Sequence, residues 1–190
     1  YSMSSILKVD QLQDSGGNNL VTSNGSGVVT AAGFGKVAQV VQDIEQGVIT
    51  YSTTYADALS LSITPSSTSS KILLNWHCTL GRGQDDFGAI SLFKDGTIVS
   101  GAIGTSGTGN QPNASNVVSN AGNIAGTIYH QSIVSNSFLD SPSSSSAITY
   151  AIKIKASYGA NIYLNRAENT NDQGHNVRTM SSLTAMEILP

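Results

Sequence analysis

The sequence has 190 residues, of which 39% are hydrophobic and only 11% are charged, and its formal net charge is −3. The charged fraction is less than half of the roughly 25% that soluble domains carry on average, so Ser, Thr, Asn and Gly supply most of the polarity. With nine Lys and Arg against twelve Asp and Glu, the chain lacks the basic surface expected of a nucleic-acid-binding protein. No apolar run approaches the ~18–20 residues of a transmembrane helix, and the single cysteine, Cys78, excludes an internal disulfide framework and a Cys-based zinc site.

Residues 1–35 are expected to form a segment of their own. Ile6–Leu12 is predicted as a short strand, and a cluster of turn formers follows it. Asn24 and Gly25 stand between two short β-branched runs, and they predict a hairpin because both residues tolerate the positive φ of tight turns. The segment is too short to bury a core. We therefore expect an N-terminal attachment segment at 1–35 and a second domain over 36–190.

From residue 37 onward the apolar residues recur with a period of two, which indicates strands with one buried face. No stretch carries a convincing helical pattern, and Asp95-Gly96 marks a two-residue hairpin. The predicted strands are 37–42, 47–52, 59–63, 71–80, a hairpin over 90–99, 126–135, 148–156, 161–165 and 182–189. About ten strands in roughly 150 residues predict an all-β fold, an antiparallel two-sheet jelly-roll sandwich.

One connection, 101–123, exceeds the ~12–15 residues of ordinary loops. It is rich in Gly, Asn and Ser, and no Asp, Glu, Lys or Arg occurs between Asp95 and Asp140. Two interpretations remain open: a surface loop or subunit contact, and a recognition loop.

Stretches of strand ends and turns, spread over nearly the whole chain, carry a resemblance to a known family. They are Ile6–Asn18, Ser62–Leu74, Phe138–Pro142, Ile162–Arg166 and Leu183–Ile188. The first resembles the start of bacteriophage tail fibres and fibre-like structural proteins, and the others resemble their C-terminal tip domains. The resemblance implies a jelly roll like that of complement C1q and tumour necrosis factor, assembled as a homotrimer. It also implies a virion component, made in the host cytoplasm, whose N-terminal segment binds other virion proteins.

The sequence offers no catalytic motif. Gly33–Ala38 matches G-x-G-x-x-A, but a β-like run follows where a dinucleotide site needs a helix. Asp85 and Asp86 are neighbours, which point to opposite faces of a strand and cannot form an acid/base pair. We therefore expect no enzyme and no cofactor. A polysaccharide hydrolase stays as an alternative, because glycosidase carboxylates can come from distant segments.

Metal binding within one chain is not expected. His77, His130 and His175 have no second ligand at i+2 or i+4. In a trimer, however, one histidine on the threefold axis would supply three ligands, and His130, predicted within a strand, is the candidate. Arg82–Asp86 is better explained as a charged turn than as a calcium site.

The densest collection of aromatic, amide and charged residues lies between 158 and 178. Sugars are bound by amide and carboxylate hydrogen bonds together with an aromatic face, and loops on a rigid sandwich are frequent recognition sites. The predicted ligand-binding residues are Tyr158, Asn161, Tyr163, Asn165, Arg166, Asn169, Asp172, His175 and Arg178. A polar surface loop is the alternative.

The expected function is non-enzymatic attachment of a virion to a host-cell surface receptor, a saccharide or a protein. Three copies per fibre would raise the avidity of weak sites by ~10²–10⁴. The alternatives are a purely structural head-fibre, decoration or adaptor protein, and a C1q-like carbohydrate-binding module. The first twelve residues show no signal-peptide pattern, so we do not expect secretion through one, and we expect no insertion into a membrane.

Overall fold

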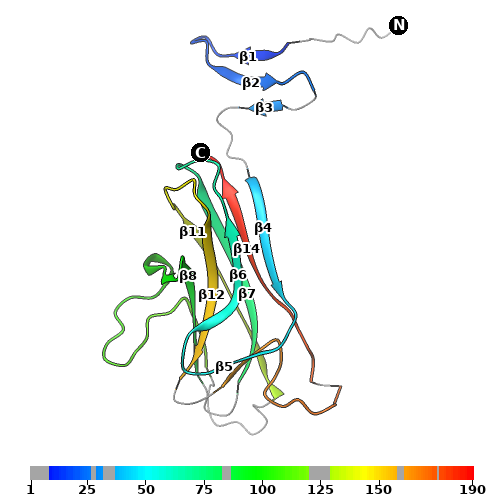
Figure 1. The fold of residues 1–190 in the computed structure, drawn as a ribbon, viewed down its shortest axis with the longest axis vertical. Coiled ribbons are helices and arrows are strands. Elements are labelled where there is room, and N and C mark those ends of the chain that lie inside the picture. Colours follow the sequence, from blue (N-terminus) through cyan, green and yellow to red (C-terminus); the bar gives the residue numbers. More distant parts are fainter. Residues whose placement is uncertain are drawn as a thin grey trace. The chain divides into compact units, whose positions relative to one another are not determined.

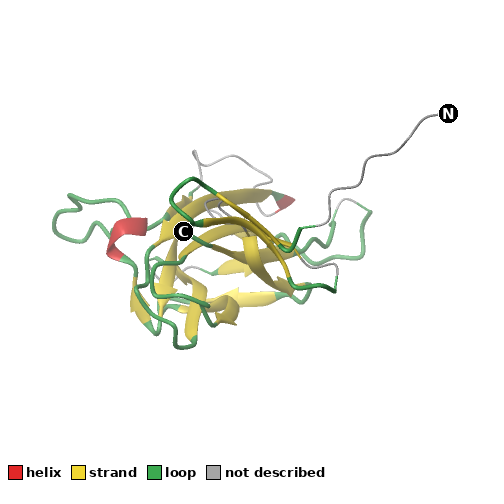
Figure 2. Cartoon of the chain, turned by 90° about the horizontal axis from the view of Figure 1, so that it is seen from above, coloured by secondary structure: helices red, strands yellow, loops and turns green. Residues whose placement is uncertain are grey.

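The computed structural model describes residues 9–26, 29–31, 37–82, 87–119, 129–157, 161–174 and 176–190. The chain divides into two compact units, Tyr1–Lys36 with Pro190 and Val37–Leu189 (Figure 1). Strands make up almost all of the regular structure (Figure 2). In the described ranges, no helix has the length and apolar character of a membrane span.

The first unit contains an antiparallel sheet in the order β1–β2–β3, with strands Gln11–Gln13, Asn19–Ser23 and Val29–Ala31. Strands β2 and β3 pair as the predicted hairpin around Asn24-Gly25, and Gly25 has a φ of 77°. The connection runs over 24–28 and is longer than the expected tight turn, and Asn24 does not have a positive φ. At the other turn, Asp14 Oδ1 accepts hydrogen bonds from the backbone N of Gly16 and Asn18, and the Asn18 side chain donates to the same carboxylate. These hydrogen bonds lower the pKa of Asp14, and the one from the Asn18 side chain has the largest effect.

The second unit consists of a larger and a smaller sheet, and every strand pair in them is antiparallel. The larger sheet contains β4 (Val37–Glu45), β5 (Ile49–Tyr51), β7 (Lys71–Arg82), β11 (Gln131–Asp140), β13 (Ile162–Leu164) and β14 (Ser181–Ile188). The smaller sheet contains β6 (Ala56–Ile63), β8 (Gly88–Lys94), β9 (Thr97–Ile98), β10 (Asn116–Val118) and β12 (Ile148–Ala156). A short 3₁₀ helix, η1, spans Ser100–Ala102.

The strand order confirms the predicted jelly roll. The larger sheet runs β4–β14–β7–β11, with β13 and β5 continuing from the far end of β7, and the smaller runs β6–β12–β8–β10. The chain therefore crosses repeatedly between the sheets, and its first and last long strands, β4 and β14, lie side by side (Figure 1). A double sheet of antiparallel strands joined by such crossings is the arrangement of a jelly roll.

The core lies between the two sheets and follows the period of two. Alternate residues of β7 are buried, namely Ile72, Leu74, Trp76, Cys78 and Leu80. Ile148, Tyr150, Ile152, Ile154 and Ala156 of β12 are buried in the same way from the opposite sheet. Burying one such large side chain contributes about 1.5–3 kcal/mol. Burial also raises the pKa of the Cys78 thiol to about 12, which keeps it neutral.

One strand prediction was wrong in position, and one strand was not predicted. The strand expected at 126–135 is β11, at Gln131–Asp140, and 126–128 lie outside the described residues. The inner face of β11, with Val134 and Phe138, also carries Asn136, and Ile133 and Leu139 lie on its outer face, so its hydrophobic alternation is weak. Within 101–123, β10 was not predicted, because a three-residue strand is too short to show a period.

A buried carboxylate joins the final strand to the turn before β7. Glu187 is fully buried, and Oε1 accepts hydrogen bonds from Ser66 N (2.7 Å), Ser66 Oγ (2.6 Å) and Ser70 Oγ (2.7 Å). Its Oε2 accepts one from Gln39 Nε2 (2.7 Å). Burial alone would raise the pKa of Glu187, but these hydrogen bonds outweigh it and lower the pKa to about 2. The charged form is therefore the stable one in the fold.

We expect Glu187→Gln to lower the free energy of unfolding by about 2–3 kcal/mol, because a neutral amide accepts these hydrogen bonds more weakly and brings in a buried NH₂ group. In the native protein, the Glu187 contribution is complete above the carboxyl's ordinary pKa of 4.5 and is lost as the pH falls toward about 2. Urea denaturation across this range measures both effects. Asp172→Asn, at an exposed carboxylate, is the control. Equal stability of Glu187→Gln and the native protein would show that the charge of Glu187 does not stabilise the fold.

Candidate functional site

The predicted binding segment lies on and after β13, which pairs with β7 and β5. The chain then runs through 165–180 to β14. Tyr158 and His175 lie outside the described residues. The seven other predicted residues fall into two groups, one used for internal contacts and one left at the surface.

Asn165 is a correction to the predicted ligand-binding set, because its side chain is fully buried. Its Nδ2 donates to the carbonyl oxygens of Glu45 (2.7 Å) and Gly47 (2.9 Å), and its Oδ1 accepts from Ser181 Oγ (2.7 Å). The backbone has a φ of 60°, a conformation that Asn adopts more readily than most residues. Asn165 therefore fixes the turn after β13 and offers no surface to a ligand.

Tyr163 and Arg166 are brought together, but in an internal contact. The Arg166 guanidinium lies 4.0 Å from the centroid of the Tyr163 ring, a cation–π geometry. Arg166 Nη1 also donates to the carbonyl oxygens of Ala167 and Glu168, each at 3.0 Å. A Cβ at Gly81 would overlap the backbone of Arg166, so glycine is required where the chain crosses β7. Arg166 thus holds its own loop.

The remaining predicted residues do not converge. Asn161, Asp172 and Arg178 are exposed, and Asn169 is half-buried. The Asn169 side-chain Oδ1 accepts a hydrogen bond from Asn171 N (2.8 Å), a local turn contact. None of these side chains lines the cavity described next.

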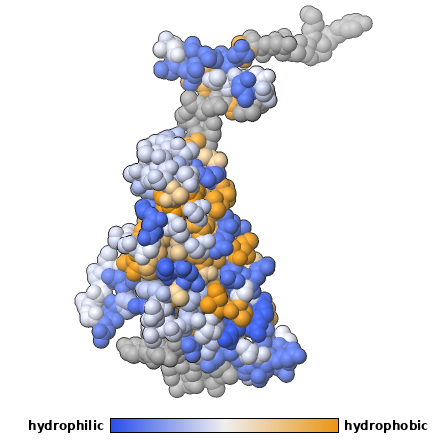
Figure 3. All heavy atoms as spheres, viewed as in Figure 1, coloured by the Kyte–Doolittle hydropathy of each residue, from blue (hydrophilic) through white to orange (hydrophobic). Residues whose placement is uncertain are grey.

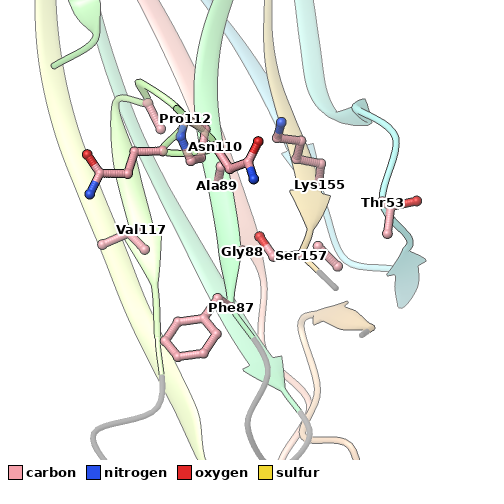
Figure 4. A pocket seen from close by; sticks show the side chains of 12 residues that line it. Thr53, Phe87, Gly88, Ala89, Asn110, Pro112, Val117, Lys155 and Ser157 are labelled. Carbon is pink, nitrogen blue, oxygen red and sulfur yellow. The ribbon is translucent and has the colours of Figure 1, made fainter. Parts of the chain in front are cut away.

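A cavity of about 570 Å³ lies on the outer face of the smaller sheet (Figure 4); we call it the β8 cavity. Val117 of β10, Ala89 of β8 and Lys155 of β12 stand in register across three strands. The small Ala89 between two larger residues leaves a hollow in the sheet surface. The other lining residues are Thr53, Phe87, Gly88, Asn110, Gln111, Pro112, Ala114, Ala156 and Ser157.

One wall of the β8 cavity comes from the long connection that follows η1, drawn in green beside β8 (Figure 1). The connection has its own hydrogen bonds: Gly104 N donates to the Ala114 carbonyl (3.1 Å), and Gln111 N donates to the Thr108 carbonyl (3.1 Å). Ser115 ties it to β8, because Leu92 N donates to Ser115 Oγ (3.1 Å). In the described ranges this segment is thus a structured wall over the smaller sheet.

Beside the cavity, aromatic rings and lysines cover the same sheet face. Tyr55 OH lies 3.0 Å from Ser91 Oγ, and the Tyr55 ring meets Phe93 edge-on at 5.2 Å. Lys155 Nζ stands 4.8 Å from the centroid of the Tyr55 ring, whereas Lys153 Nζ forms an ion pair with Asp57 (2.8 Å). Among the described residues that line the cavity, Lys155 alone is charged.

The described residues contain no cluster of three or more His, Cys, Asp or Glu placed to hold a metal. His77 Nδ1 lies 3.1 Å from Ser182 Oγ. His130 was predicted within a strand, but it is exposed and precedes β11. Gly33–Lys36 and residues 83–86 lie outside the described residues. Val37 and Ala38 begin β4, which confirms the β-like run predicted after the glycines.

Sequence reasoning missed the β8 cavity as a site. The alternation in β12 had placed Lys153 and Lys155 on one face, and the uncharged 101–123 connection had been singled out. Nothing in the sequence signalled that the Lys155 side of β12 and this connection line one cavity. In the comparisons with known proteins, the sequence matched no family model and no curated protein.

We expect Asn165→Ala to lower the free energy of unfolding by about 2–4 kcal/mol, because it strips hydrogen bonds from two backbone carbonyls and from Ser181 and leaves a left-handed residue without its amide. Urea denaturation followed by tryptophan fluorescence measures the change. Asn169→Ala is the matched control and should shift the midpoint little. A native midpoint for Asn165→Ala would show that its side chain is not structural.

Proposed function

We propose that this chain is a non-enzymatic virion attachment protein. Its N-terminal segment binds other virion proteins, and its jelly roll assembles as a homotrimer that binds a host-cell surface receptor. The resemblance of the sequence to bacteriophage fibre tips supports this proposal. The structural observation that carries it is an outer face of the larger sheet that is almost free of charge, which we call the uncharged face.

The uncharged face consists of cross-strand rows in register over β4, β14, β7 and β11, where directly paired residues share one face. One row is apolar: Val40, Met186, Leu73 and Leu139. The next is built from amides and hydroxyls: Gln42, Thr184, Asn75 and Ser137. The third is mixed: Ile44, Ser182, His77 and Ser135.

Large apolar side chains on this face are exposed in the single chain. Ile133 is 72% exposed, Val40 57% and Leu139 48%. Figure 3 shows one face of the second unit, without distinguishing its strands, and hydrophobic residues are interspersed there among hydrophilic ones. Exposed apolar groups that lie in rows favour an interface, and Lys71, at the end of β7, is the charge that borders them.

A second copy of this chain suits the uncharged face better than a charged partner does. Two uncharged surfaces meet without the desolvation cost of burying ionic groups, and the hydroxyl and amide row can hydrogen-bond across the contact. Covering β4 and β11 also protects edge strands that would otherwise invite aggregation. The proposed number of subunits, three, rests on the resemblance of the sequence to bacteriophage fibre tips.

We expect the full chain to sediment as a trimer and Leu139→Asp to sediment as a monomer, because the substitution places a carboxylate in the apolar row. Leu139 is exposed in the single chain, so its fold should survive, and circular dichroism checks this. Val177→Asp, at an exposed residue outside the sheets, is the control and should remain trimeric. A monomeric native protein, or equal dissociation of both variants, would overturn the assembly.

Attachment itself is tested on cells. We expect the fluorescently labelled trimer to be retained on intact cells of at least one strain in a bacterial panel, and unlabelled protein to compete with it. Monomeric Leu139→Asp should be retained about 10²-fold less, because multivalent binding is lost. If purified virions contain the chain but it binds no strain, the alternative of a purely structural head-fibre, decoration or adaptor protein replaces this proposal.

A further inference from the structure

We infer that the β8 cavity binds a sugar unit carrying an anionic substituent. Its role as the receptor site rests on the proposed function, but the binding chemistry is argued from the cavity alone. A volume of about 570 Å³ lies within the ~300–1,000 Å³ range of small-molecule sites.

The apolar part of the cavity suits the face of a sugar ring. Phe87 is 41% exposed, and Val117 lies nearby on β10. Figure 4 shows the Phe87 ring at one end of the cavity, below Val117. The small side chain of Ala89 forms the floor, so there is room for a ring to rest on the sheet between these walls. An aromatic side chain left open to solvent in a concave site is the usual partner of an apolar ligand face.

Amides supply hydrogen bonds at the wall. Gln111 Oε1 accepts from Thr108 N (3.2 Å) and Thr108 Oγ1 (3.3 Å). This orients the side chain and leaves Nε2 as a donor that has no partner among the described residues. Asn110 is exposed and stands near Lys155 at the end of the cavity away from Phe87 (Figure 4). Amide donors and acceptors match the hydroxyl groups of a sugar.

The charge of Lys155 selects an anionic ligand. Its ammonium group is held over the Tyr55 ring, and no carboxylate among the described residues forms an ion pair with it. Lys153, two residues earlier on the same face, is already paired with Asp57. A cation held over an aromatic ring, with no carboxylate partner among the described residues, at one end of a cavity whose other end is aromatic, fits a ring whose substituent is a carboxylate or a phosphate.

The test uses the full trimer and ligand titrations followed by saturation-transfer NMR. The probes are galacturonic acid, N-acetylneuraminic acid and galactose 6-phosphate, with galactose as the neutral counterpart. We expect the anionic sugars to bind more tightly than galactose, and the carboxylates and the phosphate to reveal which substituent is preferred. Equal binding of galactose and its anionic forms, or binding of none at tens of millimolar, would overturn the inference.

Two variants and a matched control locate the site. Lys155→Met should weaken the anionic sugars about tenfold, the loss of one charge-assisted contact, and leave galactose unchanged. Phe87→Ala should weaken all four sugars. Lys153→Met removes the same charge from the same strand outside the cavity and should leave binding unchanged. Equal losses for Lys153→Met and Lys155→Met would show a general charge effect and contradict the site.

Retention on cells separates this inference from the proposed function. If the native trimer is retained and Phe87→Ala is not, the cavity is the receptor site. If both are retained equally, attachment stands and the cavity's role in it fails. If neither is retained although anionic sugars bind the native protein, the proposed function fails and the sugar site remains.

Discussion

The fold depends on burying one face of each sheet against the other, and this burial makes an unpaired polar group between the sheets costly. Glu187 is satisfied by serines and an amide. Asp140 accepts hydrogen bonds from Tyr150 OH (2.5 Å) and Lys94 Nζ (2.8 Å), and it thereby connects β11 to the opposite sheet. Burial and this hydrogen bond raise the pKa of Tyr150, so the phenol remains a donor. Because only 11% of its residues are charged, the chain has few buried charges whose desolvation must be offset by hydrogen bonds.

The same constraint leaves the two outer faces free to differ. On the larger sheet, apolar, amide and hydroxyl rows follow one another, and such a surface suits another uncharged surface. On the smaller sheet, lysines and aromatic rings surround a hollow, and such a surface suits a small polar ligand. The two outer faces of the sandwich therefore carry different side chains, while most of the core between them is apolar.

Strands with strict alternation were predictable from the sequence, because burial of one face requires an apolar residue at every second position. The prediction of 148–156 coincides with β12, and Asp95-Gly96 forms the expected hairpin with positive φ at both residues. Strand β11 was misplaced because apolar residues, Ile133 and Leu139, also lie on its outer face and weaken the period of two. Position along the chain thus follows from hydrophobicity only where the outer face is clearly polar.

The candidate site was less predictable, because composition does not distinguish an amide that binds a ligand from one that holds a turn. Asn165 looked like a sugar contact and is an internal hydrogen-bond centre. The β8 cavity is assembled from segments around residues 53, 87–89, 110–117 and 155–157. No local motif encodes such a hollow, since it arises from strand register and from a small residue, Ala89, between larger ones.

The positions of the two faces give the proposals a common geometry. The outer faces of the two sheets point away from each other across the core, so a trimer that closes on the uncharged face leaves the β8 cavity of every copy directed outward. Assembly and recognition then do not compete for surface, and a weak sugar site is repeated around the same particle. Such repetition converts individually weak binding into avidity when the sites engage one surface together, and it would make a small cavity on a small domain sufficient for the proposed attachment.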